Sequence, residues 1–207
     1  MYKSFFKRFI DIVVSLVALP FICIGFIFIA PLIYFTDKGP IFYNAKRVGK
    51  DEKIFKMYKF RSMYVNAPDI RLADGSTYNG ADDPRVTKIG KILRKTSLDE
   101  IPQFLNVLKG DMSLIGPRPA TPMILDEMTE LQSYRFQARP GITGYTQMEY
   151  RNSAQGDKRY EADKFYVENI SFLFDMKIFF GTIKKVIKRE NIYNTPIPSE
   201  DREEIKV

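Results

Sequence analysis

Residues 12–35, IVVSLVALPFICIGFIFIAPLIYF, carry no charged side chain, and an apolar run of this length is typical of a membrane segment. As one straight helix it would measure about 36 Å, which is enough to cross a bilayer core of about 30 Å. It fits a removable secretory signal poorly, since it lacks a small-x-small cleavage motif and Pro31 directly follows Ala30. We therefore expect a membrane-inserted segment that remains attached to the chain.

The residues around this segment indicate how it enters the membrane. Cations lie on both sides of it, at Lys3, Lys7, Arg8, Lys38, Lys46, Arg47, Lys50 and Lys53. Positive charge on both flanks opposes a simple crossing, because one cluster would then lie outside. Pro20 interrupts the helix and Gly25 loosens it. We predict a helix that breaks near Pro20 and returns to the same leaflet, with an ordinary transmembrane span as the alternative.

The charge balance points to an anionic partner. The chain has 32 Lys and Arg residues against 25 Asp and Glu residues. Such an excess is typical of proteins that bind nucleic acid, an anionic membrane surface or a phosphorylated substrate, and the apolar segment argues against nucleic acid. Histidine is absent, which excludes a Ser-His-Asp triad and the usual catalytic zinc site. The chemistry must therefore depend on carboxylates, Lys, Arg, Tyr or a metal with oxygen ligands.

A second informative stretch is 91–119, KILRKTSLDEIPQFLNVLKGDMSLIGPRP. Ser97 and Glu100 have the spacing of a capping box, and apolar residues follow at helical spacing as far as Gly110, so a helix is predicted over 98–108. Acidic residues are ordinary in a first turn, which would explain Asp99 beside Glu100 without any catalytic role. Pro102 fits this helix poorly, because it removes a hydrogen bond just past the first turn.

Several cations near this stretch have the character of phosphate ligands. Lys59 and Arg61 share one face of an extended segment, and they are either phosphate ligands or part of a solvated face. Arg118 is held between Pro117 and Pro119, and a planar guanidinium on rigid backbone suits bidentate phosphate recognition. A lone arginine of this kind is more often a surface ion pair.

Three further segments carry structural expectations. Asp11, at the start of the apolar run, is expected to pair with Lys7 or Arg8 on the same helix. Residues 171–189 predict an apolar helix with cations near its end, a pattern typical of helices that lie on a membrane surface. Residues 191–207 are polar and interrupted by proline, and we expect them to be disordered.

Five blocks of sequence occur in an order that resembles one enzyme family. They are KR..D at 7–11, KRVGKDEKIFKMYKFRSM at 46–63, DDPRVTKIGKILRKTSLDEIPQFLNVLKGDMSLIGPRP at 82–119, ARPGITG at 138–144 and YEADKFYVENISFLFDMKI at 160–178. Together they resemble the bacterial sugar transferases, in particular the small monotopic polyprenyl-phosphate phosphoglycosyl transferases (undecaprenyl-phosphate sugar phosphotransferases). Several matching blocks in order are far more specific than any one motif.

The resemblance implies a reaction and a site. The family transfers a sugar 1-phosphate from a UDP-sugar to undecaprenyl (polyprenyl) phosphate, giving polyprenyl diphosphate sugar and UMP. It implies that Asp99 and Glu100 are catalytic and hold Mg²⁺, with a ping-pong mechanism through an Asp99 phosphosugar intermediate. Substrate binding is expected from Lys59, Arg61, Arg94, Arg118, Arg139 and Arg151. A glycosyltransferase that releases UDP and a non-catalytic membrane scaffold of a glycan assembly complex remain alternatives.

The expected architecture is a small, helix-rich α/β (α+β) catalytic domain with an N-terminal re-entrant membrane helix and amphipathic interfacial helices. The expected boundaries are 1–36 for the membrane helix, 37–190 for the catalytic domain and 191–207 for the tail. The family often breaks its helix at a Ser-Pro pair that aligns here with Cys23-Ile24, so the bend is expected at Pro20 or near Cys23. The resemblance places the protein on the cytoplasmic face of the bacterial inner membrane, in contact with membrane lipid, and leaves a homodimer open.

Overall fold

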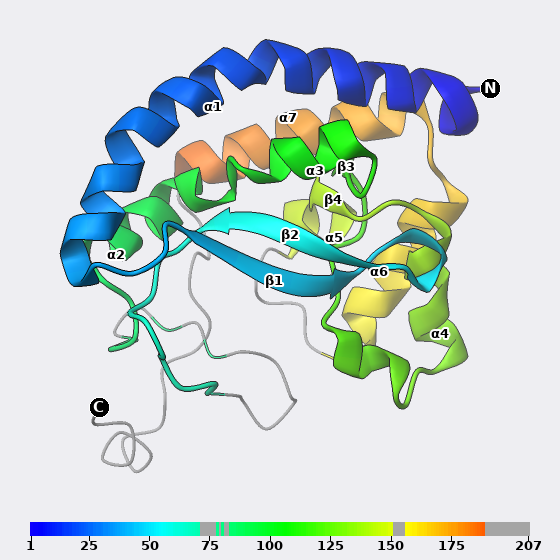
Figure 1. The fold of residues 1–207 in the computed structure, drawn as a ribbon. Helices are drawn as coiled ribbons and strands as arrows, with labels where there is room; N and C mark the ends of the chain where they lie inside the picture. The colour runs from blue at the N-terminus through cyan, green and yellow to red at the C-terminus, as the bar shows by residue number, and fades with distance from the viewer. Residues whose placement is uncertain (71–77, 79, 81–82, 151–155, 189–207) are drawn as a thin grey trace.

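A long N-terminal helix arches over a body of shorter helices and two small sheets (Figure 1). The computed structural model describes residues 1–70, 78, 80, 83–150 and 156–188. Its helices and strands are α1 (Lys7–Asp37), β1 (Phe42–Val48), β2 (Ile54–Phe60), α2 (Lys88–Thr96), α3 (Gln103–Lys109), β3 (Ser113–Ile115), α4 (Glu130–Ser133), β4 (Gly141–Thr143), α5 (Tyr145–Glu149), α6 (Asp157–Glu168) and α7 (Phe172–Lys188). The predicted mixed, helix-rich α/β class is therefore confirmed. The predicted tail, 191–207, lies outside the described residues.

Helix α1 runs without interruption from Lys7 to Asp37, although Pro20 and Pro31 lie inside it. The predicted break at Pro20 or near Cys23 is therefore wrong. A proline removes one backbone hydrogen bond and clashes with the preceding turn, and here the helix responds by curving (Figure 1). Whether the curved helix crosses the bilayer or returns to one leaflet stays a prediction.

Most of the apolar surface of α1 faces away from the body of the protein. Within the described residues, the helical stretch Tyr2–Asp37 is the one long and apolar enough to cross a membrane. Its most exposed large side chains include Val17, Phe21, Ile27, Phe28 and Phe35. Helix α7, close to the predicted 171–189, also exposes Leu173 and Phe180. An apolar surface of this extent on a long helix suits insertion in a membrane.

The first part of α1 is fastened to the body by polar contacts. Lys7 pairs with Asp175 of α7 (Nζ···Oδ2 2.6 Å), and Arg8 donates to carbonyl groups at the end of α3. Asp11 accepts hydrogen bonds from the backbone of Leu114 (2.9 Å) and from the hydroxyl of Ser113 (3.1 Å), both in β3. The predicted pairing of Asp11 with Lys7 or Arg8 is therefore replaced by contacts to β3. Asp11 joins helix to sheet.

The antiparallel hairpin β1–β2 lies below the arch and meets the second half of α1 (Figure 1). Phe42 and Phe60 pair across the hairpin and stack, with ring centroids 5.6 Å apart, and Phe26 of α1 stacks on Phe42 at the same separation. Ile29 and Ile33 of α1 are buried in a cluster with Phe60. Apolar packing thus fixes the end of α1 to the strand that carries Lys59.

The predicted helix over 98–108 forms in two parts. Ser97 ends α2 in the left-handed conformation (φ 58°), and its side chain makes no capping hydrogen bond, so the predicted capping box is wrong. Leu98–Glu100 form one 3₁₀ turn, and α3 begins only after Pro102. Pro102 explains the division, because a proline is tolerated at a helix start but not in its interior. Gly110 ends α3 as predicted, with φ 92°.

Candidate active site

The two adjacent carboxylates lie on the 3₁₀ turn between α2 and α3. The side chain of Asp99 is 3% exposed and that of Glu100 is 23% exposed. The left-handed backbone at Ser97 reverses the chain after α2 and brings both acids against strand β2. The acidic pair therefore sits on a short, tightly held connection instead of the first turn of a long helix.

Lys59 of β2 contacts both carboxylates. Its ammonium nitrogen lies 2.8 Å from Oδ2 of Asp99 and 3.4 Å from Oε1 of Glu100. Two adjacent carboxylates in a mostly buried site repel each other, and one ammonium between them offsets that repulsion. Of the two predicted strand cations, Lys59 is thus the one that the structure places at the acidic pair.

The pKa of Glu100 is set by opposing effects. Burial raises the pKa of this carboxyl, but the charges of Lys59 and Arg118, together with the Lys59 hydrogen bond, more than offset burial and lower the pKa below its usual value. A lowered pKa means that Glu100 is ionised at neutral pH and remains a carboxylate available to a cation or a hydrogen-bond donor. The net effect identifies Arg118 as a neighbour of the pair.

Arg118 has an exposed side chain on the segment that follows β3. A hydrogen bond fixes the backbone of this segment, because the guanidinium of Arg135 donates to the backbone carbonyl of Arg118 (2.9 Å). Gly116 permits the tight approach of strands β3 and β4, since a Cβ there would lie 2.2 Å from the carbonyl oxygen of Arg139. Rigid backbone therefore presents Arg118 to solvent beside Glu100, as expected for a phosphate ligand.

Arg94 lies in the last turn of α2, the helix that leads into the turn carrying the acidic pair. Its Nε donates to the hydroxyl of Ser62 (2.9 Å), a buried residue that the sequence reasoning did not select. The one signal for Ser62 was its place three residues after Lys59 in a matched block. Ser62 fixes Arg94 against the chain that leaves β2.

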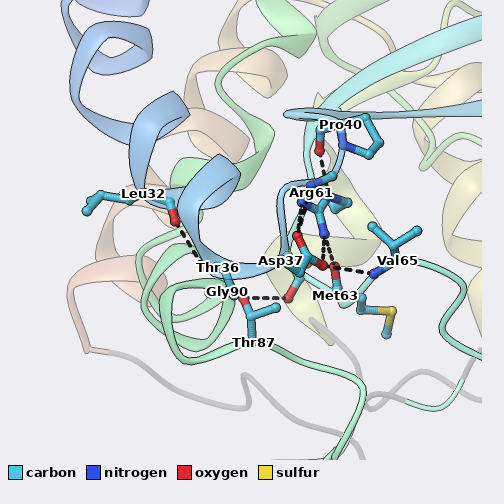
Figure 2. Close-up of polar contacts among 11 residues, drawn as sticks. Leu32, Thr36, Asp37, Pro40, Arg61, Met63, Val65, Thr87 and Gly90 are labelled. Atoms are coloured by element: carbon cyan, nitrogen blue, oxygen red, sulfur yellow. Dashed lines mark hydrogen bonds and ion pairs between the residues drawn. The ribbon is translucent and has the colours of Figure 1, made fainter.

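Arg61 is engaged elsewhere, which argues against its predicted role in substrate binding. Its side chain is 6% exposed, and its guanidinium makes a two-pronged ion pair with Asp37 at the end of α1 (Figure 2). It also donates to the carbonyls of Pro40 and Met63. Four of its five N–H groups are thereby used within the protein, so we assign Arg61 to structure. The sequence could not reveal this, because the partner Asp37 lies outside the strand.

Arg139 lies at the far end of α3 from the acidic pair. Its Nε donates to the carbonyl of Gly110 (2.9 Å), which ends α3, whereas Glu100 precedes the start of that helix. At 1.5 Å per helical residue, the two ends are on the order of 15 Å apart. The structure therefore does not bring Arg139 to the acidic pair, and gives it a capping role instead. Arg151 lies outside the described residues.

The acidic pair fits a metal that arrives with a phosphate ligand. Among the described residues, no three His, Cys, Asp or Glu side chains gather into a metal site. Asp99 and Glu100 nevertheless offer two hard oxygen donors. Mg²⁺ is commonly bound by one or two carboxylates, with substrate phosphates and water as the remaining ligands. The donor set is thus compatible with Mg²⁺ shared with a diphosphate.

Sequence comparisons extend over nearly the whole chain. The profile of the family described as "Bacterial sugar transferase" matches residues 2–189. The chain is 42% identical over 189 residues to "Galactosyl transferase CpsE" of Streptococcus agalactiae serotype III (strain NEM316), covering 87% of this chain and 42% of that protein. It is 38% identical over 208 residues to "Undecaprenyl-phosphate galactose phosphotransferase" of Salmonella typhimurium (strain LT2), covering 92% and 42% respectively.

A shorter relative matches along most of its length. The chain is 39% identical over 189 residues to "Uncharacterized sugar transferase EpsL" of Bacillus subtilis (strain 168), covering 91% of each. The chain thus spans less than half the length of the first two relatives and nearly all of the third. The profile match and these identities establish that the chain belongs to the bacterial sugar transferase family.

Proposed function

We propose that this protein transfers a sugar 1-phosphate from a UDP-sugar to undecaprenyl (polyprenyl) phosphate, forming polyprenyl diphosphate sugar and UMP. The observation that carries the proposal is the acidic pair bridged by Lys59 and flanked by Arg118. The names of two relatives, an undecaprenyl-phosphate galactose phosphotransferase and a UDP-N-acetylgalactosamine-undecaprenyl-phosphate N-acetylgalactosaminephosphotransferase, support the same donor and acceptor classes. The exposed apolar face of α1 supports a lipid-soluble acceptor.

The first step uses Asp99 as a nucleophile. Its ionised carboxylate would form a bond to the phosphorus that bears the sugar, while the bond from that phosphorus to the bridging diphosphate oxygen breaks and UMP leaves with the electron pair. Lys59, in contact with Asp99, would offset diphosphate charge during the attack. Arg118, on its exposed and rigid segment, would bind a phosphate oxygen by paired N–H donors.

The second step returns the enzyme to its starting state. An oxygen of the polyprenyl phosphate would form a bond to the same phosphorus, and the bond to Asp99 would break, so that the carboxylate is regenerated without net proton transfer. The covalent intermediate allows one site to serve a water-soluble donor and a membrane acceptor in turn. It also avoids holding both anionic substrates in the site together.

Asp99 and Glu100 are the residues that would hold Mg²⁺. When bound, the ion supplies positive charge against the diphosphate, as in other phosphoryl transfers. The site would face the cytoplasm of a bacterial cell from the inner membrane, where a charged nucleotide sugar can reach it while α1 contacts membrane lipid.

Nucleotide release tests this function directly. Protein in detergent or nanodiscs is given Mg²⁺, undecaprenyl phosphate and one UDP-sugar at a time, including UDP-galactose and UDP-N-acetylgalactosamine. UMP that appears only with acceptor or in one stoichiometric burst supports sugar-phosphate transfer. Release of UDP would instead indicate glycosyl transfer. No release from a broad panel, with a related enzyme active on the same lipid, would favour a scaffold.

Replacement of the nucleophile tests the mechanism. Asp99→Asn keeps the side-chain shape but removes the attacking charge, so turnover should fall at least about 10³-fold. The covalent intermediate should also be lost, measured as sugar label retained on acid-quenched protein. Asp51→Asn, an exposed carboxylate at the tip of the β1–β2 hairpin, is the matched control and should keep full activity. Full turnover by Asp99→Asn would contradict the covalent mechanism even if UMP is the product.

A further inference from the structure

Asp37 and Arg61 form an ion pair in which both carboxylate oxygens and both terminal guanidinium nitrogens take part. The two carboxylate oxygens of Asp37 accept from Nη1 (2.5 Å) and Nη2 (2.6 Å) of Arg61. The same carboxylate accepts from the backbone N–H groups of Val65 (3.0 Å) and Gly39 (3.3 Å) (Figure 2). The side chains are only 17% and 6% exposed. A bidentate pair of this kind fixes direction as well as distance.

The turn after α1 is locked onto the chain that leaves β2. Nε of Arg61 donates to the carbonyl of Pro40, and Nη1 donates to that of Met63 (3.1 Å). A Cβ at Gly39 would lie 2.2 Å from a Val65 methyl carbon and 3.0 Å from the Arg61 guanidinium. The space between the two segments is therefore filled, so neither segment can slide past the other.

The chain on either side of Arg61 leads to the acidic pair. On one side, Lys59 contacts Asp99 directly. On the other side, the carbonyl of Ser62 accepts from the backbone of Thr87 (3.1 Å), and a Cβ at Gly90 would lie 1.9 Å from that carbonyl oxygen, so α2 rests on Ser62. Because α2 leads into the turn that carries Asp99, the end of α1 is connected to the acidic pair from two directions.

We propose that Asp37 and Arg61 are a positioning pair that sets the depth of the acidic pair relative to the membrane surface. The proposal rests on the function proposed above. The phosphate of the lipid acceptor is held near the headgroups by its chain, whereas the UDP-sugar arrives from water. A change in depth therefore impairs reaction with the acceptor and leaves use of the donor nearly unchanged. Neither residue touches the reacting groups.

A paired variant isolates positioning from burial of a lone charge. Asp37→Asn together with Arg61→Gln removes both charges, because removal of one alone would leave the other buried and unpaired. In nanodiscs we expect kcat/KM for polyprenyl phosphate to fall about tenfold, with the donor KM changed less than about twofold. The matched control removes the exposed Lys50–Asp51 pair at the hairpin tip by Lys50→Gln and Asp51→Asn, and should change neither.

Depth is measured separately from activity. The chain contains no tryptophan, so one introduced indole is the only tryptophan fluorophore. Ile92→Trp marks α2 beside the acidic pair, and Phe35→Trp marks the end of α1; both positions are exposed. Nanodiscs with lipids brominated at shallow or deep positions report indole depth by quenching. With the paired variant, the Ile92→Trp probe should change its ratio of shallow to deep quenching, while the Phe35→Trp probe keeps its ratio.

The outcomes separate this proposal from the function on which it rests. An unchanged Ile92→Trp ratio, equal loss of donor and acceptor kinetics, or full acceptor activity in the paired variant would overturn the positioning role. If the paired variant does not fold, Arg61→Lys replaces it, since lysine keeps the charge but cannot form the two-pronged contact. A wild-type protein that releases no UMP would refute the proposed function, and the quenching ratios would still decide the role of the pair.

Discussion

At the scale of single residues, the ammonium of Lys59 offsets the repulsion between the neighbouring carboxylates of Asp99 and Glu100. Its ammonium contacts both acids, and with Arg118 it lowers the pKa of Glu100 despite burial. Since the folded pKa lies below the ordinary 4.5, ionised Glu100 contributes stability above the unfolded pKa, and that contribution is lost as pH falls through the folded pKa. The site is therefore arranged to keep Glu100 charged through the neutral range.

Lys59→Ala should move the pH dependence of turnover. Without the ammonium, burial dominates and the pKa of Glu100 rises, so the acidic limb of the pH–rate profile shifts to higher pH and the maximum rate falls. Steady-state rates across the acidic and neutral range measure the shift. Lys56→Ala, an exposed cation on the same strand, should leave the limb where it is. An unmoved limb in Lys59→Ala would mean that Glu100 ionisation does not limit turnover.

Arg118 and Arg139 should respond differently to the same substitution. Arg118→Ala removes a cation beside the acidic pair and should raise the donor KM about tenfold with little effect on stability. Arg139→Ala removes a hydrogen bond at the end of α3 and should cost about 1 kcal/mol of stability with an unchanged donor KM. Donor titrations measure the change in KM, and melting temperatures measure the change in stability, for each of the two variants. The reverse pattern would refute the assignment.

The residues could be predicted from sequence to different degrees. Asp99, Glu100, Lys59 and Arg118 were selected from the sequence because they lie in matched blocks, and the structure places these four residues near one another. Arg61 was assigned to substrate because residue type and strand alternation cannot show that a partner at the end of another element occupies its guanidinium. Such pairings depend on tertiary contacts that spacing along one segment does not encode.

At the scale of elements, α3 holds the acidic pair against the hairpin. Asn106, buried in the middle of this short helix, accepts from the backbone N–H of Tyr58 (2.8 Å) and donates to the carbonyl of Lys56 (2.7 Å). Its amide thus takes the place of a further strand beside β2. The contact keeps the start of α3, and with it Asp99, near Lys59.

Asn106→Leu should destabilise the protein by about 1–3 kcal/mol, because it removes the partners of two partly buried backbone groups of β2. The melting temperature in detergent measures the loss. Asn44→Leu, an exposed site on β1, provides the control for a change of the same kind and should be nearly neutral. Equal melting temperatures for the two variants would show that water can satisfy those groups.

The turn that precedes α3 shows where local sequence patterns fail to predict structure. Ser97 and Glu100 fit the capping-box pattern, yet the chain at Ser97 adopts a left-handed turn and starts no α-helix. Residue type permits both outcomes, and only Pro102 indicated that a helix could not run through. The end at Gly110 was predictable because glycine accepts the positive φ that a helix end requires.

At the scale of the whole molecule, the arched α1 is attached to the body near both ends. Near its start, Lys7 pairs with Asp175 (2.6 Å), and at its end Asp37 pairs with Arg61 (2.6 Å for Nη2···Oδ1). The composition of α1 was enough to predict its insertion in a membrane, but it did not predict that the helix continues unbroken from Lys7 to Asp37. Pro20 and Gly25 predicted a break, but neighbouring turns and packing on the hairpin keep the helix continuous.

Two attachments remove the usual freedom of a membrane helix. A free helix accommodates a bilayer of the wrong thickness by tilting. Here the separation of the attachment points is set by the body of the protein, so α1 cannot tilt independently of the body without breaking an ion pair. In a membrane of the wrong thickness we therefore expect more of the mismatch to fall on the surrounding lipid, whose elastic energy depends on acyl-chain length. Turnover in nanodiscs should therefore pass through a maximum as the acyl chains are lengthened, and a flat response would contradict this.

Lipid deformation also extends beyond the protein that causes it. Two molecules that deform the same bilayer share the cost when they approach each other, so a mismatched membrane would draw copies of this protein, or other proteins of equal hydrophobic thickness, into the same patch. An arch held at both ends would thus concentrate copies of this protein in a mismatched membrane without any specific contact between them.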